Sequence, residues 1–189
     1  MNYIAQNKLG FEGDVFAKEK MKHIIESNGI KTIVETGTYL GSTTKWFSQW
    51  ADKVHTFEVK QDHFNKAKEA LKGCNNITMH LGNSAYELSK VIGDLSDKTF
   101  FFLDAHWEDY NPLLDELKVI ADSGLKPIIA IHDFKVPDHP ELGFDSYKGQ
   151  DYDLEWIKPS LKLIYGEDYL IKYNTEATGA KRGIIYIYP

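Results

Sequence analysis

Two short segments of the chain place carboxylates beside imidazoles, each next to an apolar run. Asp104 and His106 follow the run TFFFL, and His132 and Asp133 follow the run IIAI. A carboxylate at the end of a buried apolar run is unfavourable unless it meets a partner or a ligand. Brought together, two carboxylates and two imidazoles could bind a divalent cation or supply a general base. The plainer alternative is an aspartate that caps a helix beside a surface histidine.

The segment Glu35–Thr43 carries two glycines four positions apart, Gly37 and Gly41, among small hydroxyl residues. Such a loop lets the backbone approach a ligand closely, and a helix that starts there favours a carboxylate or phosphate at its N-terminus. The alternative is a tight turn that needs glycine for its geometry alone. The dinucleotide-binding pattern G-x-G-x-x-G is absent, which counts against NAD.

Two further polar positions follow short runs of β type. Glu58 comes about twenty residues after the glycine loop, where a carboxylate can accept both ribose hydroxyls of a nucleoside; a solvated charge is the alternative. Asn83 and Ser84 follow Gly82. Their amide and hydroxyl groups can cap the next helix or bind an adenine edge, and capping alone would explain them.

Along the chain, short apolar runs alternate with segments of helical periodicity, and each of these polar positions follows one of the apolar runs. Strands are predicted at 31–35, 53–59, 77–81, 99–104 and 128–132, and two last runs at 169–173 and 183–188 are joined by a turn. The expected fold is α/β, a Rossmann-like doubly wound seven-stranded sheet with five parallel βα units and a C-terminal antiparallel β-hairpin. Ligands bind such sheets beyond the carboxyl ends of the strands, so the polar segments should meet there.

The 189 residues are expected to form one domain, since domains take roughly 100 to 200 residues. Residues 1–30 are predicted to be an N-terminal helical segment. Residues 135–150 have no periodicity and are predicted to be a loop that walls a substrate site, with His139, Phe144, Asp145 and Tyr147. The acidity of this loop favours a polyol, a sugar or a cationic substrate.

Composition limits the partners. The net charge of −6 and the absence of a basic run argue against nucleic-acid binding. The single cysteine, Cys74, excludes an internal disulfide. No apolar stretch approaches the roughly 20 residues of a membrane helix, and no secretory signal is visible, so a cytoplasmic protein without membrane contact is expected.

The ordered runs VETGTYLGSTT, VHTFEV, LGNS, FFLDAHW and IAIHDF resemble the class I S-adenosylmethionine-dependent methyltransferases from Lys31 onward. Within that superfamily, D-x-H followed by H-D is similar to bacterial small-molecule O-methyltransferases of the macrocin type and to the related cephalosporin hydroxylase family. The chain departs from the usual acid-x-G-x-G-x-G pattern at Tyr39, which replaces the middle glycine. Asn83 stands where an acid commonly binds adenine.

The resemblance implies roles for individual residues. The cofactor would be held at its methionine part, its ribose and its adenine by Glu35, Gly37, Thr38, Tyr39, Gly41, Ser42, Thr43, Glu58, Val59, Asn83, Ser84 and Asp104. Asp104 and Asp133 would bind Mg²⁺ or another divalent cation, with His132 as a further candidate ligand. His106 and Asp133 would act in catalysis, His106 as a base toward a substrate hydroxyl.

The predicted function is therefore methyl transfer from S-adenosylmethionine to an oxygen of a small molecule such as a sugar or polyol, assisted by a cation. Two alternatives stay open: a cofactor-binding module without turnover, and a hydroxylase-like or NAD-dependent reaction on the same scaffold. A homodimer is also possible, since Tyr3, Trp46 and Trp50 could belong to the core or to an interface.

Overall fold

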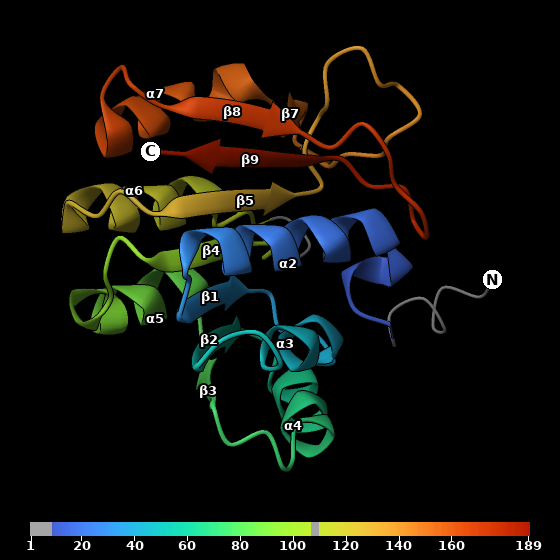
Figure 1. The fold of residues 1–189 in the computed structure, drawn as a ribbon, viewed down its shortest axis with the longest axis vertical. Coiled ribbons are helices and arrows are strands. Elements are labelled where there is room, and N and C mark those ends of the chain that lie inside the picture. Colours follow the sequence, from blue (N-terminus) through green and yellow to red (C-terminus); the bar gives the residue numbers. More distant parts are fainter. Residues whose placement is uncertain (1–8, 107–109) are drawn as a thin grey trace.

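The computed structural model describes residues 9–106 and 110–189, in which a seven-stranded sheet has the order β3-β2-β1-β4-β5-β9-β8 (Figure 1). Its strands are β1 (Thr32–Thr36), β2 (Lys53–Glu58), β3 (Ile77–Leu81), β4 (Thr99–Leu103), β5 (Ile128–His132), β8 (Leu170–Tyr173) and β9 (Ile184–Tyr188). Strands β1 to β5 are parallel, and β9 is antiparallel to both β5 and β8. The predicted fold class is confirmed.

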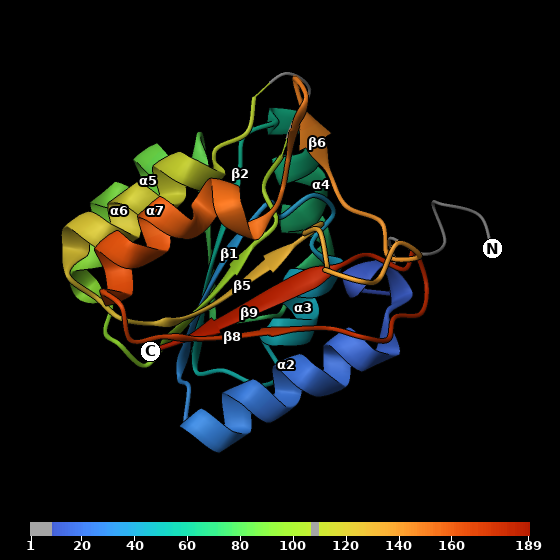
Figure 2. The same cartoon turned by 90° about the horizontal axis from the view of Figure 1, so that it is seen from above.

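Helices cover both faces of the sheet (Figure 2). One face carries α2 (Val15–Asn28), α3 (Ser42–Phe47) and α4 (Gln61–Ala70), and the other carries α5 (Ser84–Val91), α6 (Leu113–Ser123) and α7 (Leu154–Tyr165). Two short 3₁₀ turns, η1 (Phe11–Gly13) and η2 (Ile92–Asp94), precede α2 and follow α5. None of the helices in the described residues has the length and apolar character needed to cross a membrane.

Strand β4 explains why the sheet needs both layers. All five of its residues are buried. Phe100 and Phe102 pack with Phe47 and residues of α2, whereas Phe101 and Leu103 pack with residues of α6 and α7. A parallel strand covered on both faces has an unbroken apolar sequence, which is the pattern that identified it.

The strand order reverses between β1 and β4, which are neighbours in the sheet although β2 and β3 come between them in the chain. All five parallel strands end at the same edge. The segments 36–43, 58–60, 82–84, 104–106 and 132–134 therefore leave the sheet together, and a doubly wound sheet binds its ligands at such a reversal point.

The segment between β5 and α7 is mostly irregular, as predicted, but it contains a short antiparallel pair, β6 (Ser146–Tyr147) and β7 (Gln150–Asp151). Trp46 and Trp50 pack, partly buried, against the core cluster beside α2. The structure therefore favours the core for these two side chains. Tyr3 and Trp107 lie outside the described residues.

Candidate active site

A cavity of about 340 Å³ lies at the carboxyl edge of the parallel strands, a volume within the range of small-molecule sites. Most of the residues singled out from the sequence line it: Gly37, Thr38, Tyr39, Ser42, Thr43, Glu58, Val59, Asn83, Ser84, Asp104, His106, His132 and Asp133. Glu35 and Gly41 do not. The cavity thus runs along the whole edge, from the end of β3 to the end of β5.

The glycine loop is shaped by the neighbouring strand. Gly37 has a φ of 85°, and a Cβ there would lie 2.5 Å from the carbonyl oxygen of Asp104. Both Gly37 and Thr38 donate their backbone N–H groups to the carbonyl of Phe57, at 3.0 Å. Gly41, with a φ of 81°, is the N-cap residue of α3. Glycine is therefore required at position 37 by the close approach of β4.

Glu35 lies under this loop and not in the cavity. Its Oε2 atom accepts hydrogen bonds from Thr44 Oγ1 and, at 2.7 Å, from Thr56 Oγ1. Thr56 also bonds Thr38, at 2.6 Å between the two hydroxyl oxygens. Burial raises the pKa of Glu35 to about 8, against the opposing effect of the two threonine hydroxyls. Glu35 is therefore placed to hold the loop in position.

Glu58 is buried at the end of β2 and joins two parts of the cavity wall. Its two oxygens accept the backbone N–H groups of Tyr39 and Lys60, each at 2.8 Å. The ring of Tyr39, whose φ is 48°, stands edge-on to His63 with centroids 4.7 Å apart. A carboxylate has about four acceptor positions, so Glu58 retains capacity for two ligand hydroxyls.

Asn83 and Ser84 start α5 at the far end of the cavity. Asn83 Oδ1 accepts the backbone N–H of Tyr86 at 3.1 Å, so the predicted capping role is present. Ser84 donates its hydroxyl to the buried carboxyl of Glu116 on α6. Burial raises the pKa of Glu116 to about 7, while Ser84 and Thr36 lower it. Asn83 and Ser84 both line the cavity, where the Asn83 side chain also lies close to Tyr110.

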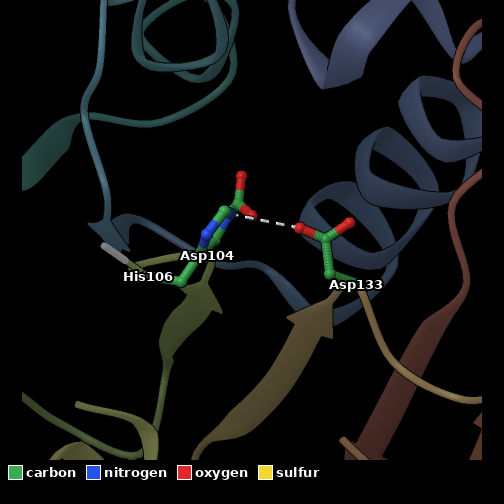
Figure 3. Close-up of side chains that lie close together, drawn as sticks. All are labelled: Asp104, His106 and Asp133. Carbon is green, nitrogen blue, oxygen red and sulfur yellow. Dashed lines mark ion pairs between the residues drawn. The ribbon is translucent and has the colours of Figure 1, made fainter. Parts of the chain in front are cut away.

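The ends of β4 and β5 bring the predicted acid and imidazole groups together (Figure 3). His106 Nε2 lies 3.4 Å from Asp133 Oδ2. His132 Nδ1 lies 3.1 Å from Asp104 Oδ1 and 3.2 Å from Asp133 Oδ1, but its direction suits a hydrogen bond to neither. Asp104, His106 and Asp133 each offer one ligand atom within 4.8 Å of the others.

The charges in this cluster support one another. The hydrogen bond to Asp133 raises the pKa of His106 to about 9, although burial opposes it. Burial alone would lower the pKa of His132, but Asp133 and Asp104 raise it well above its usual range. His106 therefore holds a proton at neutral pH, and a role as a base requires this proton to leave.

Sequence reasoning missed Arg182 as a member of the site. Its guanidinium donates to Asp133 through Nε and to Asp145 through Nη2. Asp145 also lies beside His106, with 3.5 Å between Oδ2 and Nδ1. A signal was present, because Arg182 is the only arginine among the 22 basic residues of the chain, and arginine is the residue best suited to paired carboxylates.

Glu12 was also missed. It lines the cavity from η1, in a left-handed backbone conformation with φ 49° and ψ 27°. The glycines on either side, Gly10 and Gly13, have φ values of 66° and 84°. A glycine pair around two non-glycine residues was the available signal for an unusual turn.

No family model matches the sequence, and no curated protein is similar to it in sequence. Solved structures do share its fold. The O-methyltransferase from Bacillus cereus, in complex with SAH, has a TM-score of 0.65 at 19% identity over 92% of this chain and 80% of that one. The O-methyltransferase TomG from Streptomyces achromogenes, in complex with SAM, has a TM-score of 0.62 at 15% identity over 91% and 78%.

The fold is not confined to that reaction. The precorrin 8w decarboxylase from Methanobacterium thermoautotrophicum has a TM-score of 0.57 at 14% identity over 90% of this chain and 89% of that one. At these identities the likeness concerns the fold, so the reaction has to be argued from the site. The chain has the fold of the class I S-adenosylmethionine-dependent methyltransferases, as its sequence motifs predicted.

Proposed function

We propose that the protein transfers the methyl group of S-adenosylmethionine to an oxygen atom of a small molecule. The observation that carries the proposal is one continuous cavity. It joins the glycine loop and Glu58 at one end to Asp104, His106 and Asp133 at the other. A cofactor held at the first end would present its reactive group to an acceptor held at the second, which is the alignment that methyl transfer needs.

The cofactor end is built for a nucleoside with an amino-acid tail. Glu58 is fixed by two backbone N–H groups and faces the cavity, where it would accept the ribose hydroxyls. The Asn83 amide would bind the adenine edge. The loop from Gly37 to Thr43 would hold the methionine part, with Asp104 beside it. Glu35 would act beneath that loop, and Gly41 would act within it as the N-cap residue of α3.

Bound S-adenosylmethionine supplies an activated methyl group, whose carbon–sulfur bond breaks as the carbon–oxygen bond to the acceptor forms. The residues of the chain then have to orient the acceptor hydroxyl and remove its proton. His106, held 3.4 Å from Asp133, is the proposed acceptor of that proton, and it can take the proton only after it has given up the one that Asp133 stabilises on its ring.

We further propose that a divalent cation assists the methyl transfer. The donor set fits one, because two carboxylates and an imidazole lie within 4.8 Å of one another and suit Mg²⁺ or Mn²⁺. Arg182 and His132 lie against Asp133 Oδ1, and His106 lies 3.4 Å from Oδ2, so an ion bound at Oδ2 would take the place of this His106 contact. Such a cation would make an acceptor hydroxyl easier to deprotonate.

The acceptor is proposed to be a small molecule such as a sugar or polyol. The cavity is small and the segment 135–150 lies beside its acceptor end through Asp145. A homodimeric state and a cytoplasmic location stay predictions. The alternatives also stay open: a module that binds cofactor without turnover, or a hydroxylase-like or NAD-dependent reaction.

Thermal-shift and calorimetric titrations with S-adenosylhomocysteine and with NAD separate these possibilities. We expect S-adenosylhomocysteine to stabilise the wild-type chain and NAD to have no effect. Glu58→Ala should weaken S-adenosylhomocysteine at least about tenfold, because two charge-assisted hydrogen bonds are lost. Glu69→Ala, which removes an exposed carboxylate on α4, is the matched control. Stabilisation by NAD alone would overturn the proposal.

A further inference from the structure

The turn that carries Glu12 has an unusual backbone. Four consecutive residues, Gly10 to Gly13, all have positive φ, and two of them are Phe11 at 48° and Glu12 at 49°. For residues other than glycine the left-handed region costs about 1 kcal/mol each. Such a conformation persists only where the surrounding structure holds it.

Contacts on both sides hold this turn. Phe11 donates its backbone N–H to Thr43 Oγ1 at 3.0 Å, and its buried ring packs edge-on against Phe47 with centroids 5.3 Å apart. On the other side Asp14 accepts the backbone N–H of Thr178 at 3.1 Å. The loop between β8 and β9 leaves no room for a side chain at Gly179, where a Cβ would meet the Glu12 carbonyl.

The carboxylate of Glu12 is partly buried. No hydrogen bond or ion pair joins it to a residue within 9–106 or 110–189. Burial raises the pKa of Glu12, His132 lowers it, and Asp133 and Asp104 raise it again. Glu12 therefore feels the charges at the ends of β4 and β5, and it lines the same cavity as His132, Asp133 and Asp104.

His132 also lines the cavity. It is only 4% exposed, and its Nδ1 atom lies within ion-pair distance of Asp104 and Asp133 without a well-directed hydrogen bond to either. Of the described cavity residues at the ends of β4 and β5, Ala105 alone is apolar. An aromatic or aliphatic acceptor would leave the Glu12 carboxylate without water and without a hydrogen-bond donor among the described residues, which is costly.

We propose that Glu12 binds a second hydroxyl group of a polyhydroxylated acceptor, apart from the hydroxyl that receives the methyl group. This inference rests on the proposed methyl transfer and adds the recognition of the acceptor. An ionised carboxylate only accepts hydrogen bonds, and each hydroxyl of a polyol can donate one to it.

The test uses acceptors that differ in their number of hydroxyl groups. Methyl transfer from S-adenosylmethionine is measured with myo-inositol and methyl glucoside, with cyclohexanol, and with 2-aminocyclohexanol. We expect transfer to at least one polyol and little to cyclohexanol. Transfer to no polyol by a chain that binds S-adenosylhomocysteine, equal transfer to cyclohexanol, or a clear preference for the amine overturns the inference.

Variants then test the residue itself. Glu12→Gln keeps the shape of the side chain, and Glu12→Gly removes it at a φ that glycine accepts without strain, so at least one variant should fold. Both should raise KM for the polyol about tenfold with a smaller change in kcat, and leave S-adenosylhomocysteine affinity unchanged. Glu19→Gln, at an exposed position on α2, is the control.

The outcomes keep the two proposals apart. If the wild-type chain does not bind S-adenosylhomocysteine, the proposed function fails. If it binds and methylates a polyol, but both Glu12 variants retain the wild-type KM, only the role of Glu12 fails. Weaker S-adenosylhomocysteine binding in both variants would instead assign Glu12 to the cofactor and would also overturn the inference.

Discussion

Asp133 accepts a hydrogen bond from Nε of Arg182, although the two residues are 49 positions apart in the chain. The same guanidinium holds Asp145 through Nη2. Backbone hydrogen bonds join the same segments. Phe134 N–H donates to the carbonyl of Gly183 at 2.9 Å, and Asp145 N–H donates to the carbonyl of Asp133 at 2.9 Å. The end of β5 is therefore fastened to the chain just before β9.

Arg182→Gln should lower the free energy of unfolding by about 3 kcal/mol, because it leaves Asp133 buried with one partner fewer. Urea denaturation measures this change. Lys181→Gln alters the exposed neighbouring position and should have almost no effect. Equal losses in both variants would mean that the guanidinium contributes nothing specific.

Asp104→Asn should weaken Mn²⁺ binding at least about tenfold, because it removes one of two carboxylate ligands. Isothermal titration of the wild-type chain and the variant with Mn²⁺ measures the affinity without any acceptor. Asp122→Asn, which removes an exposed carboxylate on α6, serves as the control. Identical isotherms for wild type and Asp104→Asn would contradict the proposed cation site.

Glu35 should make stability depend on pH. The folded chain keeps the Glu35 proton up to about pH 8, whereas an ordinary glutamate loses it near 4.5. Its contribution is thus fully present below pH 4.5 and is lost as the pH rises to about 8, on the order of a few kcal/mol.

Glu35→Gln is neutral at every pH, so its unfolding free energy should fall less than that of the wild-type chain over this window. Chemical denaturation at several pH values compares the two. Glu19→Gln, with an exposed side chain, should keep the wild-type slope. Parallel curves for wild type and Glu35→Gln would show that the buried carboxyl does not hold its proton.

Gly37→Ala should destabilise the fold by about 2 kcal/mol and abolish tight binding of S-adenosylhomocysteine. The added methyl group would lie 2.5 Å from the Asp104 carbonyl oxygen, so the loop would have to move away from β4. Gly93→Ala is the matched control, since nothing lies within 4 Å of a Cβ at that position. Thermal unfolding and calorimetry report the two effects separately.

The sequence predicted the sheet well because strands β4 and β5 are buried on both faces and read as unbroken apolar runs. The positions of Glu58 and Asn83 in the cavity were predicted for a related reason. Glu58 and Asn83 directly end a strand or start a helix, so their place in the fold follows from their place in the chain. Glu35 also lies near the end of a strand, so the same pattern predicted it as a ligand-binding residue. Its side chain instead bonds Thr44 and Thr56 beneath the loop, and the local sequence does not reveal this direction.

The residues around the ends of β4 and β5 were predicted less completely. Asp104 and Asp133 followed from strand ends, but Glu12 and Arg182 reach the site from an irregular turn and from the connection before β9. Their positions depend on long-range contacts, such as those of Thr178 with Asp14. Periodicity carries no information on contacts between residues 164 positions apart.

The distance along the chain between Glu12 and the β8–β9 connection has a consequence for synthesis. Strands β1, β2 and β3 lie in the first half of the chain, and β4, which pairs with β1, follows them. The turn at Glu12 gains its contacts with Thr178 and Gly179 only when the last hairpin emerges. This turn would therefore reach its final form only among the last events of folding.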